Sequence, residues 1–275
     1  MRTKGDIDWR ATLEAATEDA REAVSKVASS GQRSSSVGVG ASGDVTLLAD
    51  RKAEKAILRP LSKIPDTRIV SEEAGDIGPR DAARVVVVDP LDGSSNYQRG
   101  VPFYCSSVGV VEGRTLSSLR HALIRDLVNG DVYFAEKGHG ASRNGRSIRT
   151  SKVKSLGAAV AGIDVSRAPA SVVRSLAGLV SSVGRQVHFG ANALELCLLA
   201  EGKIDVVVDV RGRARLVDVA GGLLIAGEAG AVISTPRGSP LNPRLSSGSR
   251  FDFVASANEE LHRLVLRELE LPREP

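Results

Sequence analysis

Two aspartates that could hold a cation, Asp89 and Asp92, follow directly on a run of four valines, Val85–Val88. A β-branched run without polar alternation is typical of a strand buried on both faces. Pro90 has no amide proton to give a β-ladder, and Gly93 permits unusual backbone angles, so we expect the strand to end here. Both carboxylates are then fixed where a rigid strand enters a tight turn.

The next residues, Ser94, Ser95 and Asn96, are able to open a short helix whose free N–H groups point back at the same place. Acidic oxygens that gather hard cations, beside amides that bind an anion, are what a metal-dependent phosphate enzyme requires. The alternative is an Asp-Gly turn between two strands. That alternative leaves Asp89 unexplained, because an acid at the end of an all-valine strand is rarely without a partner.

Two further acidic positions stand at the ends of predicted elements. A predicted strand at 68–72 ends in the pair Glu72 and Glu73, whose alternative is a solvated acid pair in a loop. Asp218 introduces a helix rich in alanine and glycine, which would let another backbone approach closely. The alternative is that Asp218 merely caps that helix.

Composition excludes several classes of protein. The 275 residues are 42% hydrophobic and 25% charged, which is typical of a globular protein long enough for one two-lobed unit or two small domains. The sequence shows neither an apolar run of membrane-spanning length nor the apolar core of a signal peptide, so we predict a cytoplasmic protein without a membrane partner. Cys105 and Cys197 lie in apolar surroundings and are predicted to be buried thiols rather than a disulfide.

Charge and motif patterns exclude further classes of protein. The net charge of +4 comes from scattered basic residues, so we expect no nucleic acid, and small anionic substrates fit equally well. The glycine-rich segment 38–43 formally matches a dinucleotide fingerprint but lacks a preceding strand, and we reject it. The four histidines show no metal-ligand spacing and are predicted to be structural or surface residues; they are His121, His139, His188 and His262.

The remaining pattern predicts alternating helices and strands, and thus an α/β fold. Expected helices are 8–30, 47–61, 170–183 and 192–201; expected strands include 101–111, 119–127, 131–135, 158–163, 186–189 and 204–208. Segment 31–43 is predicted to be a mobile loop, and Asn129-Gly130 a type I′ hairpin turn. We expect an N-terminal lobe, 1–150, carrying most of the acidic positions, and a C-terminal lobe, 151–275.

The motifs together resemble those of the inositol monophosphatase superfamily, which includes sugar-bisphosphate phosphatases. DPLDGSSN (89–96) is similar to its first signature, VDVAGGLLIAGEAG (217–230) to its second, and IVSEE (69–73) to its upstream glutamate motif. Gly-Val-Pro-Phe after the first signature also agrees, and the resemblance covers most of the chain from Asp44 to Ile233. It implies a layered α-β-α-β-α sandwich with the site between two lobes.

The resemblance also implies roles. One Mg²⁺ would be held by Glu72, Asp89 and the Leu91 carbonyl, and a second by Asp89, Asp92 and Asp218. Glu72 would help to hold a third ion. Mn²⁺ is a possible substitute for Mg²⁺. Asp44 and Ser94, with Glu72, would orient and activate the attacking water. The substrate would be bound by Gly93, Ser94, Ser95, Asn192, Arg211 and Arg215.

One position departs from the animal enzymes of that superfamily. Where these have a glutamate that binds inositol hydroxyls, this sequence has Arg211, within the trio Arg211, Arg213 and Arg215. An arginine favours a second anionic group over a neutral polyol, and the segment resembles the archaeal-type members that hydrolyse both fructose 1,6-bisphosphate and inositol 1-phosphate. The alternative is a solvated basic loop paired with Asp209.

The sequence therefore predicts a magnesium-dependent phosphatase of small phosphate esters, assembled as a homodimer or higher homo-oligomer. Two alternatives stay open at this point. One is a nucleotide 3′-phosphatase of the same superfamily. The other is a regulatory or binding homologue that has lost catalysis, against which the full set of acidic positions argues.

Overall fold

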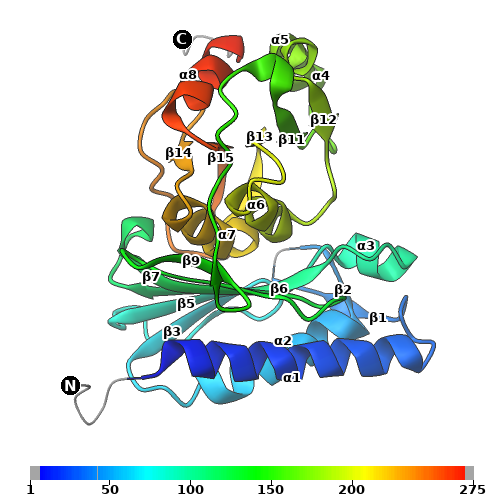
Figure 1. Cartoon of the computed structure of the whole chain (residues 1–275). Helices are drawn as coiled ribbons and strands as arrows, with labels where there is room; N and C mark the ends of the chain where they lie inside the picture. Colours follow the sequence, from blue (N-terminus) through cyan, green and yellow to red (C-terminus); the bar gives the residue numbers. More distant parts are fainter. Residues whose placement is uncertain (1–6, 42, 270–275) are drawn as a thin grey trace.

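The computed structural model describes residues 7–41 and 43–269, which form two large β-sheets, a two-stranded ribbon, and layers of helices that cover and separate the large sheets (Figure 1). The helices are α1 (Trp9–Ser29), α2 (Leu48–Leu61), α3 (Ser94–Arg99), α4 (Ala170–Ser175), α5 (Ala177–Ser182), α6 (Asn192–Ala200), α7 (Leu216–Glu228) and α8 (Glu259–Glu268). The strands of the larger sheet are β3 (Thr67–Ser71), β4 (Gly75–Ile77), β5 (Arg84–Asp92), β6 (Cys105–Glu112), β7 (Leu119–Asp126), β8 (Val132–Glu136), β9 (Gly140–Arg143) and β10 (Arg146–Ser147). The smaller sheet contains β11 (Val160–Ile163), β12 (Arg185–Val187), β13 (Val206–Arg215), β14 (Val232–Ser234) and β15 (Arg250–Ser256).

The larger sheet is organised around β5, which lies between β6 and β3. Its valines alternate between two cores: Val86 and Val88 pack with residues of α1 and α2, whereas Val85 and Val87 pack with residues of α7. The sheet therefore has helices on both faces, with α1 and α2 outside and α6 and α7 inside (Figure 1). The prediction of a strand buried on both faces is confirmed.

The smaller sheet packs against the other side of α6 and α7, and α8 covers its outer face with α4 and α5 (Figure 1). Its strand order is β12-β11-β13-β15-β14, with β11 parallel to β12 and β13. The order of layers is thus helix, sheet, helix, sheet, helix, which confirms the sandwich that the family resemblance implied. The division into lobes at residue 150 stays a prediction, although all strands of the larger sheet precede that position and all strands of the smaller sheet follow it.

The central strand ends within segment 89–93, as predicted, but it runs through Pro90 before it does so. β5 continues to Asp92, and its register with β6 shifts between Asp89, which pairs with Ser107, and Asp92, which pairs with Cys105. Pro90 and Leu91 thus face the single residue Ser106, whose hydroxyl donates to the Pro90 carbonyl at 2.6 Å. A β-bulge of this kind accommodates a proline, because the bulged residues leave the ladder while the strand goes on.

One loop prediction and one turn prediction differ from the structure. The segment predicted to be a mobile loop contains β1 (Ser36–Val39), which pairs antiparallel with β2 (Val45–Leu47) in a two-stranded ribbon. The β7–β8 connection is longer than a two-residue type I′ turn: it runs from 127 to 131, and only Gly130 of the Asn129-Gly130 pair has positive φ. Asp126 accepts from the N–H groups of Val128 and Asn129 and so fixes that longer turn.

Other boundaries differ in ways that local pattern does not reveal. The helix expected at 170–183 is two short helices, α4 and α5, that meet at Leu176, and β6 begins at Cys105 rather than at residue 101. β13 extends beyond residue 208 to Arg215, with an irregular stretch between Asp209 and Ala214. Asp218 does not cap α7, because Arg215 occupies the N-cap position.

The first turn of α2 holds a buried carboxyl that makes stability depend on pH. Asp50 accepts from the Leu47 N–H at 2.6 Å, and burial, with the charges of Glu73 and Glu72 adding to it, raises the pKa of Asp50 to about 8. Between about pH 4 and 8 the folded protein then keeps a proton that the unfolded chain has lost. Unfolding releases this proton, so the stability it confers is lost as the pH rises.

We predict that the metal-free protein loses stability between pH 5 and 7, by up to about 1.4 kcal/mol per pH unit from Asp50 alone. Asp50→Asn should flatten this slope by that amount, because its amide does not titrate. The measurement is urea unfolding in EDTA at several pH values. Equal slopes for the variant and the unaltered protein would show that Asp50 is ionised in the folded state.

Candidate active site

Three aspartates from distant parts of the sequence are buried together at the β5 bulge. Asp89 is fully buried, and Asp92 and Asp218 are nearly so. One oxygen of Asp89 accepts from the Leu91 N–H at 3.0 Å, and its other oxygen, Oδ2, is buried with no hydrogen-bond partner among the residues that the structure describes. Asp92 accepts from the N–H of Ala193 at 2.7 Å, which ties β5 to the first turn of α6.

Burial and mutual repulsion raise the pKa of all three carboxyls. For Asp89 the cause after burial is the charge of Glu72, followed by Asp92 and Asp218. For Asp92 it is the charge of Asp218. Burial also raises the pKa of Asp218, but Arg215 opposes it and the result is about 6. Carboxyls that raise one another's pKa in this way lie close enough to share a counter-charge.

Arg215 supplies part of that counter-charge. Its Nε lies 2.9 Å from each carboxylate oxygen of Asp218, and its Nη1 lies 2.6 Å from Glu72 and 3.3 Å from Asp44. Burial lowers the pKa of the guanidinium, but the charges of Asp218 and Glu72 outweigh this and hold it above its usual value. The side chain therefore stays charged inside the carboxylate cluster.

The turn after the bulge is held by a glycine in the left-handed region. Gly93 has φ +86°, and a Cβ on it would lie 2.9 Å from the Phe103 carbonyl and 3.0 Å from the Ala191 side chain. The next residue, Ser94, begins α3, as predicted. Asn96 extends this packing, because its Nδ2 donates to the carbonyls of Phe103 and Phe189. The turn is thus fixed against the loop that precedes β6 and the loop that precedes α6.

A single cleft of about 780 Å³ brings most of the predicted site residues together. Of these, it is lined by Asp44, Glu72, Asp92, Ser94, Ser95, Asn192, Arg211 and Arg215. Asp89 and Leu91 lie buried in the bulge, Gly93 adjoins Ser94, and Asp218 is held by Arg215. Asp44 is the most open of the acidic residues, with 62% of its side chain exposed.

Arg211 is not in the solvated basic loop that was one interpretation of the sequence. Only 9% of its side chain is exposed; it is bidentate to Asp209 at 2.8 and 2.6 Å and also pairs with Asp164. Its Nη1 donates to the Ser166 carbonyl at 2.8 Å. Arg213 lines the same cleft and is exposed, with no ion pair in the described part of the chain.

The cleft also contains residues that the sequence analysis missed. His188 lies between Glu195, at 3.0 Å, and Asp164, at 3.4 Å; burial lowers its pKa, but these two carboxylates outweigh burial and raise it. Arg167 and Arg250 also line the cleft. The sequence offered one signal: Asp164 directly follows a predicted strand, as Asp89 does. Of the other histidines, His262 is buried between Ser234 and Ser256, and His139 is exposed.

The donor set fits a hard cation, although no three His, Cys, Asp or Glu side chains within 7–41 and 43–269 are already arranged around one metal position. Carboxylate and carbonyl oxygens are the ligands that Mg²⁺ prefers. The unpartnered Oδ2 of fully buried Asp89 is left to take up a proton or a cation, because an isolated buried charge is costly. The arrangement therefore suits a cation-dependent site that also admits an anion.

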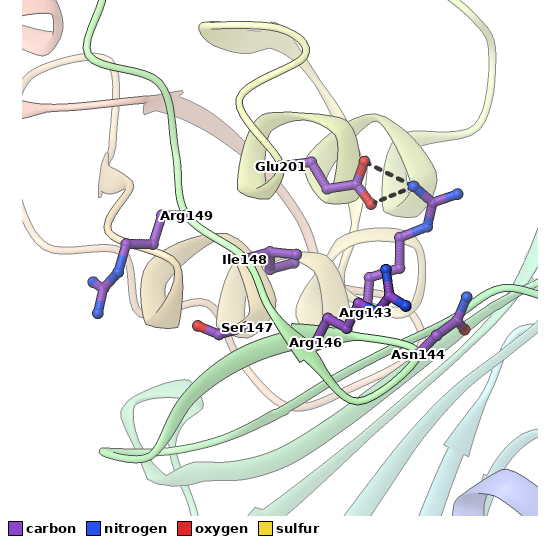
Figure 2. A pocket seen from close by; sticks show the side chains of 7 residues that line it. All are labelled: Arg143, Asn144, Arg146, Ser147, Ile148, Arg149 and Glu201. Carbon is purple, nitrogen blue, oxygen red and sulfur yellow. Dashed lines mark hydrogen bonds and ion pairs between the residues drawn. The ribbon is translucent and has the colours of Figure 1, made fainter.

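A second cleft, of about 640 Å³, is lined by residues of the β9–β10 region and by Glu201. Figure 2 shows that Arg143 reaches towards Glu201, whereas Arg149 points away from both. This cleft offers a single carboxylate, which Arg143 already neutralises at 3.1 Å. It provides no set of oxygen ligands comparable to the bulge.

The two cysteines are buried free thiols, as predicted, and burial raises the pKa of both.

The layered α/β sandwich and its oxygen-rich cleft together define a hydrolytic enzyme of the phosphatase class. The model of the inositol monophosphatase family matches residues 8–271, and the chain belongs to that family. It is 35% identical over 230 residues to a fructose-1,6-bisphosphatase/inositol-1-monophosphatase of Thermococcus kodakarensis, covering 84% of this chain and 85% of that protein. A protein of the same description from Methanothermobacter thermautotrophicus is 32% identical over 275 residues, covering 96% and 97%.

A solved structure agrees with this assignment. An inositol monophosphatase-fructose 1,6 bisphosphatase superposes with a TM-score of 0.84 at 31% identity, covering 96% of this chain and 100% of that one. The family is metal-dependent in general, which accords with the oxygen-rich bulge. Among the described residues no helix is long and apolar enough to cross a membrane.

We predict that Gly93→Ala destabilises the fold by about 2 to 5 kcal/mol, because it adds left-handed strain and two close contacts. Gly100→Ala is the matched control: Gly100 has φ +76° at the other end of α3, with nothing within 4 Å of an added Cβ. The control should lose only the strain, about 1 to 2 kcal/mol. Urea unfolding of both variants measures the difference, and equal losses would exclude the close packing at Gly93.

Proposed function

We propose that the protein is a Mg²⁺-dependent phosphatase that hydrolyses phosphate monoesters of small sugars and polyols, with fructose 1,6-bisphosphate and inositol 1-phosphate as substrates. The observation that carries the proposal is the buried acidic cluster at the bulge, with the unpartnered oxygen of Asp89, next to the first turn of α3. The two relatives described above carry both activities in their names, which supports this choice of substrates.

The cations would be held by Glu72, Asp89, the Leu91 carbonyl, Asp92 and Asp218. Two or three Mg²⁺ ions fit the number of oxygens, and Mn²⁺ has similar preferences. Bound there, the ions would neutralise charge on the phosphoryl oxygens and on the departing alkoxide. The protein's own contribution is to hold the ligands rigidly: the bulge fixes Asp89 and Asp92, and α7 brings Asp218 to them.

The other residues would position the reactants. The N–H groups of Gly93 and Ser94 and the Ser95 hydroxyl would bind phosphate oxygens; Ser94 and Ser95 line the cleft at the start of α3, which supports this role. Asp44 and the Ser94 hydroxyl, with Glu72, would orient the attacking water and accept its proton. Water then attacks phosphorus in line with the leaving oxygen, and no covalent intermediate with the protein is required.

The substrate end of the cleft favours an anionic group beside the sugar. Arg211, Arg213 and Arg167 all line the cleft, with Asn192 at the start of α6. The carboxylates of Asp209 and Asp164 hold the Arg211 fork in one orientation, which lowers the entropy cost of a further contact. We propose that Arg211 and Asn192 contact the part of the substrate distal to the reacting phosphate.

A phosphate-release screen tests the proposal directly. It would compare fructose 1,6-bisphosphate, inositol 1-phosphate and a nucleoside 3′-phosphate, with and without Mg²⁺. The first two should be hydrolysed only with the metal. Preference for the nucleotide would favour the nucleotide 3′-phosphatase alternative, and no hydrolysis of any ester would favour the regulatory alternative. The homo-oligomeric assembly, the cytoplasmic location and the absence of a nucleic-acid partner stay predictions.

We predict that Asp89→Asn lowers turnover by more than about 100-fold at saturating Mg²⁺. Its stability without metal should equal or exceed that of the unaltered protein, because a buried charge among other carboxylates is removed. Phosphate release and urea unfolding in EDTA measure the two effects. Asp126→Asn is the control, a buried aspartate that caps the β7–β8 turn and should lose stability while keeping its turnover. Near-normal turnover of Asp89→Asn would exclude Asp89 as a metal ligand.

We predict that Arg211→Ala lowers kcat/KM for fructose 1,6-bisphosphate by about 10- to over 100-fold and affects inositol 1-phosphate less. It should also lower the melting temperature, because Asp209 and Asp164 lose their shared partner. Arg211→Lys keeps the positive charge without the planar guanidinium, so its kcat/KM for fructose 1,6-bisphosphate should lie between those of the unaltered protein and Arg211→Ala. Equal losses on both substrates would mean that Arg211 supports structure only.

A further inference from the structure

The contacts of Arg215 engage the same oxygens that the proposed metal ligands would use. Nε lies 2.9 Å from both oxygens of Asp218, and Nη1 lies 2.6 Å from Oε1 of Glu72. The same Nη1 reaches Asp44, the proposed water-orienting residue, at 3.3 Å. A carboxylate oxygen that accepts a short charge-assisted hydrogen bond is a poorer ligand for a cation, because both partners compete for the same lone pairs.

The position of Arg215 is fixed by the fold rather than by chance surface pairing. It is the last residue of β13 and the N-cap of α7, so its backbone cannot move without moving Asp218 three residues later. Its side chain is only 17% exposed. Within a buried cluster of this kind an arginine and its carboxylates interact far more strongly than an exposed pair.

Charge balance gives the arginine a reason to be there. When ionised, Glu72, Asp89, Asp92 and Asp218 would together carry four negative charges, and three of the four, all but Glu72, are buried. Without a cation such a cluster repels itself and opposes folding. Arg215 is the cation that the chain itself provides within hydrogen-bond distance of two of them. Arg250 also lines the cleft, but its Nη1 donates to the carbonyls of Ser247 and Ser249, and it acts on Asp218 through its charge alone.

We propose that Arg215 is a built-in counter-ion that competes with metal ions for Glu72 and Asp218, so that it stabilises the chain before metal binding and weakens metal affinity. The inference rests on the ligand set of the proposed function. When metal ions bind, the guanidinium must release these oxygens, and it then remains in the cleft as a mobile cation close to the position of the phosphate. Arg215 is thus a positioning residue whose first effect is on metal binding rather than on chemistry.

The test compares Arg215→Gln with Arg213→Gln. Both variants remove one positive charge from the wall of the same cleft, but Arg213 has no ion pair in the described residues. Calorimetric titration of each full-length protein with MgCl₂ gives the affinity, and thermal unfolding in EDTA gives the stability of the metal-free form. Neither measurement depends on enzymatic activity.

For Arg215→Gln we expect Mg²⁺ to bind at least about tenfold more tightly than to the Arg213→Gln protein. The variant should melt several degrees lower in EDTA and show a larger rise in melting temperature when Mg²⁺ is added. Arg215→Lys keeps the charge with fewer hydrogen bonds, so its affinity should lie between those of the unaltered protein and Arg215→Gln. If the Arg215→Gln protein does not fold, the Arg215→Lys protein decides the question, and its Mg²⁺ affinity is then compared with that of the unaltered protein.

Two results would overturn the inference, and they differ in what else they exclude. Arg215→Gln could bind Mg²⁺ no more tightly than Arg213→Gln, or Arg215→Lys no more tightly than the unaltered protein. Arg215 would then support the metal-binding geometry instead of competing with it, and the proposed function would stand. If the unaltered, folded protein binds no Mg²⁺ at millimolar concentration, the ligand set itself is wrong and the proposed function fails as well.

Discussion

The burial of several carboxylates at one point, the bulge of β5, is the constraint on which the rest of the structure depends. Placing an ionised carboxylate in a dry interior costs several kcal/mol unless it is paired, and here Asp89, Asp92 and Asp218 share one region. Each has a partner from a different segment: the Leu91 N–H, the Ala193 N–H and the Arg215 guanidinium. These partners come from β5, α6 and the β13–α7 junction, so satisfying the charges also fixes the middle helix layer between the two sheets.

The same arrangement explains why the first signature contains a proline. A regular strand would point Asp89 and Asp92, three residues apart, to opposite faces of the sheet. The bulge opposite Ser106 adds one residue to β5 and thereby changes the facing of everything after it. Pro90 suits the inserted position because it has no N–H to leave unpaired. The two carboxylates can then meet at the same end of the strand, which local alternation alone forbids.

Much of this could be predicted from the sequence, and the limits have physical causes. The four valines, the helix of 9–29 and the acidic ends of two strands are local patterns, and the structure shows the expected elements there. The bulge was missed because proline normally ends a strand, and only the register with β6 shows that this one continues. The β1–β2 ribbon was missed because its glycines and serines have little intrinsic preference for strands, so tertiary pairing decides. The two helices of the middle layer, α6 and α7, lie where the sequence predicted helices. Both are apolar on nearly every side, as helices packed between two sheets must be.

The arginines show most clearly what a sequence leaves undetermined. Arg211, Arg213 and Arg215 alternate along one strand segment, and Arg211 and Arg215 were both candidates for binding a substrate anion. Their environments are unlike: Arg213 is exposed, Arg211 is gripped by two aspartates, and Arg215 lies inside the carboxylate cluster. Part of the difference comes from neighbours in sequence, Asp209 and Asp218. The rest comes from Asp164, Glu72 and Asp44, which lie 47 or more residues away in the chain and meet these side chains only in the fold. An arginine therefore acquires its role from the negative charge that the fold places around it, and charge pattern along the chain alone cannot assign that role.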